Sequence, residues 1–371
     1  MRDATQIIRS MLTPVTPGEP LHSGPVFTAP YHTPGDPADA AYSYGRSHNP
    51  TWTSLEKAIA QMEHAGGAEA LVFASGMAAC AAAFGAVLRP GDAVVLPSDS
   101  YFGARKLATE YFGAMGVEVR SAPTAGNAQG ALLKGAKLLW IESPSNPTMG
   151  ICDITALCEA AHKEGVLVAV DNTTPTPLGQ RPLALGADFS VASDTKSMTG
   201  HSDLLLGHVA VRDPDLRAKL DHWRTLTGGV PGPMEAWLAH RSITTLPLRL
   251  DRSCENAHRI AEYLTTRKEV EAVLYPGLPA HPGHEIAVKQ MRRFGPVLSF
   301  TLHDRATAER FLAKAQLITE ATSFGGIATT AERRARWGGD AVSEGFIRMS
   351  AGCEAIEDLI EDIGQALDAV R

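Results

Sequence analysis

The segment VLVAVDNT, from Val166 to Thr173, decides the fold class of this chain. Its first five residues are a continuous apolar run, and Asp171 follows directly. Such a run is typical of a strand that is covered on both faces, as strands of parallel sheets are. Three further short apolar runs have the same character and lie at Ala93–Leu96, Leu138–Ile141 and Phe189–Ala192. The sequence therefore predicts a buried sheet.

Helical patterns alternate with these apolar runs. In Asp153–Lys163, for example, Leu157 and the pair Ala160–Ala161 fall on one side of a helix. Strands that alternate with helices predict an α/β fold, with a mostly parallel sheet sandwiched by helices. In such sheets the ligand lies beyond the carboxyl ends of the strands. We therefore expect the chemistry in the loops that follow the apolar runs.

Changes in composition divide the chain into three parts. Residues 1–50 are rich in Pro, Gly, Ser and His without a sustained period, and predict an extended N-terminal arm. Residues 51–247 contain the alternating segments and predict a large ligand-binding domain. Residues 248–371 contain two long amphipathic patterns, Leu250–Arg267 and Glu354–Val370, and predict a smaller C-terminal α/β domain.

The overall composition excludes several classes of protein. Of the 371 residues, 44% are hydrophobic and 20% are charged, the balance of an ordinary globular protein. The net charge of −7 argues against a nucleic-acid or anionic-membrane partner, and no apolar run approaches the ~20 residues that span a bilayer. The five cysteines are scattered and never spaced as CxxC, which predicts no disulfide framework and a cytoplasmic location.

Three segments at the ends of expected strands carry the candidate chemistry. Lys196 lies in a polar loop directly after the run FSVA. Asp171 ends its strand as a carboxylate that needs a cationic or donor partner, because burying it unpaired costs several kcal/mol. The segment Phe73–Met77 turns from a strand into a helix through small residues, and a helix N-terminus binds anions.

Together the three segments describe one ligand. It has an anionic group for the helix start, a protonated ring nitrogen for the carboxylate, and an aldehyde to which an amine can bond. Pyridoxal 5'-phosphate (PLP) has these three groups. The sequence therefore predicts a PLP site at the carboxyl ends of the strands.

The sequence also resembles the Cys/Met-metabolism family of PLP enzymes, the trans-sulfuration group that includes cystathionine γ-lyase, cystathionine γ-synthase and methionine γ-lyase. The resemblance covers nearly the whole chain. Its ordered motifs are YGRSHNPT from Tyr44, SGMAA from Ser75, ESPSNP from Glu142, DNT from Asp171, QRPLALGAD from Gln180, GHSD from Gly200, YPGL from Tyr275 and FIRMS ending at Ser350. The resemblance implies PLP fold type I, the fold of aspartate aminotransferase, with PLP bound in the domain of residues 51–247.

The resemblance implies roles for individual residues. Lys196 would bond to the cofactor and shuttle protons, Asp171 would pair with the pyridine nitrogen, and Tyr101 would stack on the ring and act as an acid or base. Lys196 and Tyr101 are thus the expected catalytic residues. The full expected cofactor set is Tyr44, Arg46, Ser75, Gly76, Met77, Tyr101, Asp171, Ser193, Thr195 and Lys196.

The resemblance also implies a shared site and a substrate set. Tyr44 and Arg46 would reach the phosphate of a neighbouring subunit, which predicts a homotetramer built as a dimer of dimers with shared active sites. Asn146 and Ser323 would lie beside the substrate, and Arg348 would clamp its α-carboxylate. No metal is expected, and the pair of histidines in the HPGH turn from His281 is assigned to structure.

The implied reaction is γ-elimination on a sulfur amino acid, and cystathionine, giving cysteine, 2-oxobutyrate and ammonia, is favoured. Cystathionine γ-synthase, which acts on an O-acylhomoserine, and methionine γ-lyase stay open, because Lys106 and Thr322 depart from the family pattern where the distal end of the substrate is expected. A non-catalytic PLP-fold binding protein and an aminotransferase are further alternatives. Asp194 departs too: the family has a small residue between Ser193 and Thr195, and this carboxylate either alters the field near the phosphate or points to solvent.

Overall fold

The computed structural model describes residues 1–13, 16–63 and 65–371, and its largest unit is a seven-stranded sheet. The strand order is β1-β7-β6-β5-β4-β2-β3. The bounds are β1 Glu69–Phe73, β2 Ala93–Pro97, β3 Glu118–Ala122, β4 Leu138–Glu142, β5 Leu167–Asp171, β6 Phe189–Ala192 and β7 Gly207–Val211. The strands from β3 to β6 pair in parallel, and β7 runs antiparallel to both of its neighbours. The mostly parallel sheet predicted from the sequence is confirmed.

Helices cover both faces of this sheet because successive strand side chains point to opposite faces. On one face lie α3 (Gly76–Val87) and α7 (Pro214–Thr227), which pack on residues such as Leu96 and Trp140. On the other face lie α2 (Pro50–Glu63), α5 (Ile154–Lys163), α6 (Thr176–Gly179) and α8 (Pro233–Ile243). The strands are therefore buried on both sides, as their continuous apolar runs require.

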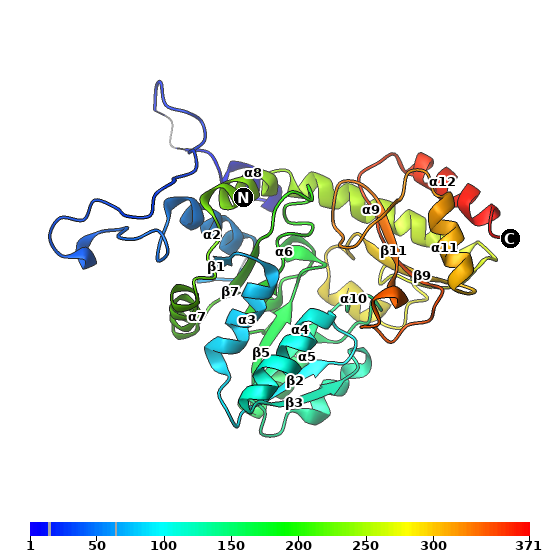
Figure 1. Ribbon diagram of the computed structural model, residues 1–371, viewed down its shortest axis with the longest axis horizontal. Coiled ribbons are helices and arrows are strands. Elements are labelled where there is room, and N and C mark those ends of the chain that lie inside the picture. The colour runs from blue at the N-terminus through cyan, green and yellow to red at the C-terminus, as the bar shows by residue number, and fades with distance from the viewer. Residues whose placement is uncertain (14–15, 64) are drawn as a thin grey trace.

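A second, smaller sheet forms the C-terminal part of the molecule (Figure 1). Its order is β10-β11-β12-β9-β8, with bounds β8 Val270–Leu274, β9 Val297–Leu302, β10 Thr319–Glu320, β11 Thr330–Arg333 and β12 Phe346–Ser350. Its helices are α9 (Leu246–Thr265), α10 (His284–Gln290), α11 (Arg305–Lys314) and α12 (Ile356–Asp368). Residues of α9, α11 and α12 share one apolar core with this sheet. Since α9 begins at Leu246, the boundary predicted at residue 247 falls within its first turn.

The N-terminal region leaves the body of the molecule as an extended arm (Figure 1). After the short α1 (Asp3–Arg9), the described residues from 16 to 49 contain one short 3-10 turn, Pro37–Asp39, and isolated β-bridges at His22, Pro30 and Tyr44, and are otherwise irregular. Leu21, Phe27 and Tyr44 on this arm are 72%, 66% and 47% exposed. The arm therefore presents apolar side chains that its own chain does not cover.

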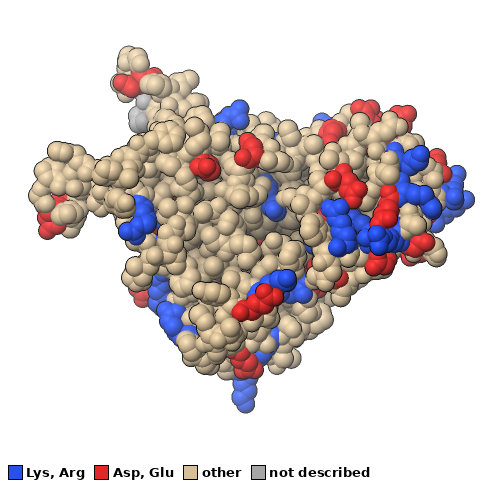
Figure 2. All heavy atoms as spheres, in the orientation of Figure 1, with Lys and Arg blue, Asp and Glu red and all other residues tan. Residues whose placement is uncertain are grey.

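Charge is unevenly spread over the face shown in Figure 2. Positive and negative side chains lie intermixed over the C-terminal part, whereas the arm and the surface beside it are mostly uncharged. Among the described residues, no helix has the length and the apolar content needed to cross a membrane.

Packing of α3 against α7 gives a first test of this fold. The substitution Gly85→Ala should lower the melting temperature, because a Cβ at Gly85 would lie 2.2 Å from ring atoms of Trp223. Each kcal/mol lost from the free energy of unfolding should lower it by about 2–4 °C. Overpacking of this kind costs about 1–3 kcal/mol, more than the ~1 kcal/mol that Ala gains over Gly within a helix. In the control Gly130→Ala the nearest atom lies at 3.7 Å. An unchanged melting temperature for Gly85→Ala would contradict this packing.

Candidate active site

A cavity of about 330 Å³ opens at the carboxyl ends of β4, β5 and β6, next to the start of α3. It lies where the large sheet meets loops of the small-sheet domain. Residues of both parts line it: Ser75, Gly76, Met77, Cys80, Tyr101, Phe102, Glu142, Asn146, Asp171, Thr173, Thr174, Ser193, Thr195, Lys196, Leu205, Thr322, Ser323, Phe324, Arg334, Trp337 and Arg348. Thus the structure brings together all the predicted site residues except Tyr44 and Arg46.

The start of α3 forms a close turn at one wall of the cavity. Ser75 caps the helix, because its hydroxyl accepts a hydrogen bond from the Ala78 amide at 3.1 Å. Gly76 follows, and a Cβ there would lie 2.5 Å from the Cβ of Ser193. Only glycine therefore lets the helix start approach the loop after β6. The free amide groups of a helix start favour an anion at this wall.

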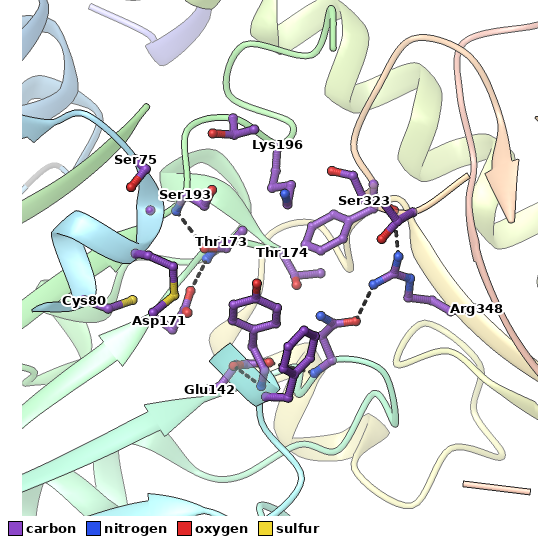
Figure 3. A pocket seen from close by; sticks show the side chains of 18 of the residues that line it. Ser75, Cys80, Glu142, Asp171, Thr173, Thr174, Ser193, Lys196, Ser323 and Arg348 are labelled. Atoms are coloured by element: carbon purple, nitrogen blue, oxygen red, sulfur yellow. Dashed lines mark hydrogen bonds between the residues drawn. The ribbon is translucent and has the colours of Figure 1, made fainter. Parts of the chain in front are cut away.

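Asp171 ends β5 and is buried at the floor of the cavity. Its Oδ1 accepts a hydrogen bond from the Thr173 amide at 3.0 Å, and the Thr173 hydroxyl accepts one from the Ser193 amide at 2.8 Å (Figure 3). Burial raises the pKa of Asp171, while the hydrogen bonds from Thr173 and the positive charges of Lys196 and His208 act against that rise. The carboxylate is thus placed to bind a protonated nitrogen in the cavity.

Lys196 follows β6 and points its amine into the cavity (Figure 3). Its Nζ lies 5.6 Å from the centre of the Phe324 ring. Burial lowers the pKa of Lys196, the neighbouring Arg348 cation lowers it further, and Asp171 opposes both. A lowered pKa leaves more of the amine unprotonated at neutral pH, which is what a nucleophile or a base requires.

Glu142 organises the opposite wall, a role that the sequence motif did not reveal. It ends β4, and its two carboxylate oxygens accept hydrogen bonds from the amides of Tyr101 at 2.8 Å and Asn146 at 2.7 Å. Burial raises the pKa of Glu142 well above its usual range, as does the nearby charge of Asp171. Burial likewise raises the pKa of Tyr101, which keeps its hydroxyl protonated.

Arg348 projects from β12 of the small sheet into the same cavity. Its guanidinium donates to Asn146 Oδ1 at 2.9 Å, to the Ser323 carbonyl at 2.7 Å and to Glu332 Oε1 at 2.5 Å. Burial lowers the pKa of Arg348 to about 10, although Glu332 opposes the change, so the group stays charged at neutral pH. Ser323 adopts a φ of 74°, which is strained for serine, and it contributes its carbonyl oxygen here. The predicted substrate set is therefore contiguous.

Tyr44 and Arg46 lie away from the cavity of their own chain. Arg46 donates to the Thr225 carbonyl at 2.5 Å, and its guanidinium carbon lies 5.6 Å from the centre of the Tyr44 ring. Their expected role in a neighbouring subunit remains a prediction.

Arg334 and Trp337 are lining residues that the sequence did not single out. The guanidinium of Arg334 is buried and binds Glu332 at 2.7 Å and Asp340 through Nε at 3.0 Å. Trp337 donates to Glu332 at 2.7 Å. The run of charges from Glu332 to Arg336 is typical of a solvated face, and it carried no signal of this placement. Lys106, considered for the distal end of the substrate, is exposed and is not among the lining residues.

These observations fit PLP. The Gly76 turn offers amide groups to a phosphate, Asp171 can hold a protonated ring nitrogen, and Lys196 supplies an amine of lowered pKa. Among the described residues, no cluster of His, Cys, Asp and Glu is arranged to hold a metal ion.

Comparison with known proteins agrees with this reading of the cavity. The chain matches the family described as "Cys/Met metabolism PLP-dependent enzyme" over residues 20–368. The chain belongs to this family. It is therefore a PLP-dependent enzyme, and its fold is that of the trans-sulfuration enzymes.

Several members of the family are similar over nearly the full length. A protein of Streptomyces coelicolor, provisionally named a cystathionine gamma-lyase, is 56% identical over 368 residues, 99% of this chain and 93% of the relative. The cystathionine gamma-synthase of Mycobacterium tuberculosis is 40% identical over 336 residues, 88% of this chain and 86% of the relative. The solved structure of a methionine gamma lyase from Micromonospora echinospora has a TM-score of 0.93, with 37% identity and 99% of each chain covered.

The approach of α3 to the loop after β6 generates a prediction for cofactor binding. The substitution Gly76→Ala should raise the dissociation constant for PLP by about 10-fold or more, because the new Cβ would displace Ser193 and open the anion site. Titration of the apoprotein with PLP, followed by absorbance, measures this.

The control is Gly229→Ala, whose Cβ would lie at an ordinary 3.8–3.9 Å from its neighbours. If Gly76→Ala bound PLP as tightly as this control and the unmodified chain, the assignment of the anion site to this turn would be wrong.

Proposed function

We propose that this chain is a lyase that catalyses γ-elimination on a sulfur amino acid, with cystathionine as its preferred substrate. One water is consumed, and the products are cysteine, 2-oxobutyrate and ammonia. The observation that carries the proposal is the meeting of Lys196, Tyr101 and Arg348 in one cavity with Asp171. The set contains a base, an acid, a carboxylate clamp and a partner for the cofactor ring.

Each residue has a distinct task in this proposal. Arg348 binds the α-carboxylate of the substrate and so presents Cα to the amine of Lys196. That amine removes the proton at Cα and, once it has given this proton up, removes one at Cβ so that the bond between Cγ and sulfur can break; a lowered pKa suits it to both steps. Tyr101, protonated at neutral pH, donates a proton to the sulfur that departs from Cγ.

Asp171 acts on the cofactor rather than on the substrate. A charge-assisted hydrogen bond from a ring nitrogen to this carboxylate contributes about 1.5–3 kcal/mol and keeps the nitrogen protonated. The bound PLP then supplies an electron sink for the carbanion chemistry. Ser75, Gly76, Met77, Ser193 and Thr195 would hold its phosphate.

The choice of cystathionine rests on similarity and on the lining of the cavity. The relative that is 56% identical carries the name cystathionine gamma-lyase, which supports this substrate. Thr322 and Arg334 both line the cavity and offer polar groups to the second amino-acid end of cystathionine. Relatives named cystathionine gamma-synthase and methionine gamma lyase keep γ-replacement on an O-acylhomoserine and cleavage of methionine as the alternatives.

A substrate panel tests the proposed reaction. We expect kcat/KM to be highest for cystathionine, with cysteine and 2-oxobutyrate as products, when cystathionine, methionine, homocysteine and O-succinylhomoserine with cysteine are compared. Pyruvate with homocysteine would identify a β-lyase, methanethiol as the dominant product would identify a methionine γ-lyase, and efficient formation of cystathionine would identify a synthase. Each of these three results would contradict the proposal.

The matched control for this panel is Lys196→Ala. Lys196 is the single lysine that lines the cavity among the described residues, so no other amine there can take its place. The variant should lose turnover on every substrate and the visible absorbance of the lysine-bound cofactor together. Turnover at the normal rate in this variant would show that Lys196 is not the base.

The proposal extends to the assembly. We infer a homotetramer, a dimer of dimers located in the cytoplasm, in which Tyr44 and Arg46 complete the phosphate site of a neighbouring subunit. The exposed apolar side chains of the arm and the mostly uncharged surface beside it support a contact with a second copy of the chain (Figure 2). The only other partner that the proposal requires is the amino-acid substrate.

Complementation between subunits tests the shared site. Arg46→Ala alone should weaken PLP binding by about 10-fold or more, because a charge-assisted hydrogen bond to the phosphate is lost. Mixing it with Lys196→Ala should restore activity, since a mixed dimer contains one site with both residues intact. Activity of the mixture is the measurement. No recovery, under conditions in which labelled subunits demonstrably exchange, would place Arg46 outside its neighbour's site, and a stable active monomer in sedimentation would contradict the assembly.

A further inference from the structure

A cluster of three buried ionisable side chains lies behind the lysine loop. Asp194, His208 and Glu63 are each no more than 1% exposed. The Nδ1 of His208 lies 2.7 Å from Asp194 Oδ1, and its Nε2 lies 3.9 Å from Glu63 Oε1. The Ser190 hydroxyl donates to the same Glu63 oxygen at 2.7 Å. Asp194 therefore does not point to solvent, which corrects one of the two alternatives left open for it.

The cluster joins three elements at the carboxyl end of the large sheet. Glu63 ends α2, His208 is the second residue of β7, and Asp194 belongs to the turn after β6. The residues on either side of Asp194 line the cavity, whereas Asp194 itself does not. The ion pair with His208 thus holds the rear of the turn whose front carries Ser193, Thr195 and Lys196.

Further hydrogen bonds hold the same turn within its loop and against the residue that precedes β7. The Asp194 carbonyl accepts from the amide of Thr199 at 3.1 Å and from its hydroxyl at 2.8 Å. The Leu206 amide, two residues before His208, donates to the Thr195 hydroxyl at 3.0 Å. Gly207 in turn touches the start of α3, since a Cβ there would lie 2.7 Å from Gly76 Cα. A substitution at His208 should therefore alter the geometry of both the Ser193–Lys196 turn and the anion site at the start of α3.

The cluster also places a positive charge beneath the site. Burial by itself lowers the pKa of His208, but the charge of Asp194, the hydrogen bond to Asp194 and the nearby carboxylate of Glu63 raise it to about 10. The ionisable groups that face the ring are Glu63 from α2 and Asp194 from the turn after β6, while β1 and β6 present the apolar Val72 and Ala192 beside it. At neutral pH the imidazolium lowers the pKa of Asp171.

Stability alone does not account for this arrangement. A buried ion cluster is often no more stabilising than apolar side chains of the same volume. Three of its atoms, Glu63 Oε2, Asp194 Oδ2 and His208 Nε2, have no hydrogen-bond partner among the described residues. Three polar atoms of the cluster lack partners in the described part of the chain, yet the cluster supports the turn that carries Lys196 and adjoins Gly207, which packs on the start of α3. Its effect on the cofactor site explains it better.

We propose that Asp194, His208 and Glu63 form a positioning unit for the cofactor, which holds the Ser193–Lys196 turn against the start of β7. The proposal rests on the PLP site argued above and on no particular substrate. None of the three residues touches the cavity, so they act through the turn.

Binding of PLP to the apoprotein tests the positioning role without turnover. We expect His208→Gln and Asp194→Asn each to raise the dissociation constant for PLP by about 10-fold. The dissociation constant of the double variant for PLP should not exceed the larger of the two single-variant values, since both substitutions disrupt the same unit. Additive losses would show two independent defects and would overturn the unit. Asp194→Asn changes charge without volume, and it serves if His208→Gln fails to fold.

The matched control is His240→Gln. His240 is also buried, but it bonds Ser10 at 3.1 Å, lies outside the cavity lining, and has a pKa lowered by burial to about 4. This variant should bind PLP normally. If it weakened PLP binding as much as His208→Gln does, the effect would reflect general loss of packing, and the positioning role would be overturned.

Two pH measurements test the charge. A group whose pKa is raised on folding stabilises the folded apoprotein at pH values below its pKa in the unfolded chain. This stabilisation is lost as the pH rises through its pKa in the folded chain. The advantage of the unmodified chain over His208→Gln in melting temperature should therefore be full below about pH 6.5 and should fade toward pH 10. A constant difference would show that folding does not raise the pKa of His208 and would contradict the buried ion pair.

In the holoprotein, loss of the imidazolium should raise the pKa of neighbouring groups. The pH midpoint of the visible absorbance change should therefore move upward, by about 0.5 unit or more, in His208→Gln and not in His240→Gln. A lower melting temperature with an unchanged midpoint and unchanged PLP binding would mean that the cluster only supports the fold. If the unmodified chain bound no PLP, the cofactor site itself would fail, while failure to cleave cystathionine would leave this inference intact.

Discussion

The buried carboxylate of Asp171 is the constraint on which the rest of the site depends. Burial in a low-dielectric interior disfavours the charged form, and the pKa of this group is accordingly raised. The surroundings resist that rise with hydrogen bonds from Thr173 and with the charges of Lys196 and His208. A protonated ring nitrogen in the cavity would complete this compensation. The cofactor is thus part of the electrostatic balance of the folded protein as well as of its chemistry.

The topology of the large sheet places the other functional groups near Asp171. Parallel strands end at the same edge, so Glu142 from β4, Asp171 from β5 and the Ser193–Lys196 turn after β6 meet without any sequence proximity. The small sheet adds Arg348 from β12. Because the clamp and the base come from different parts of the chain, the distance between them depends on how the two sheets pack.

Local patterns predicted the elements that are buried and regular. The runs Ala93–Leu96 and Phe189–Ala192 correspond to β2 and β6 with bounds that differ by at most one residue, since each is mostly apolar and flanked by polar or small residues. The edge strand β3 was missed because its residues, Glu118–Ala122, are mostly polar and pair on one side only. The strand β7 was missed as well, since Gly207 and His208 interrupt its apolar pattern.

The site was predictable where single motifs carry the chemistry, as at Lys196 and Asp171. It was not predictable where distant residues meet through the fold. His208 is 14 residues from Asp194 and 145 from Glu63 in the sequence, and only the packing of α2, β6 and β7 unites them. The placement of Arg334 was not predictable either, because a run of charged residues is ordinarily solvated. Here Glu332 and Asp340 form ion pairs with the buried Arg334.

The most direct test of the account is to trap the cofactor on the chain. Borohydride reduction of the holoprotein, followed by digestion and mass spectrometry, would fix the cofactor to the amine that holds it. The account predicts one modified residue, Lys196, and no modification in an Asp171→Ala preparation that has lost its cofactor. A reduced cofactor on any other lysine, or a holoprotein that reduction leaves unmodified, would contradict it.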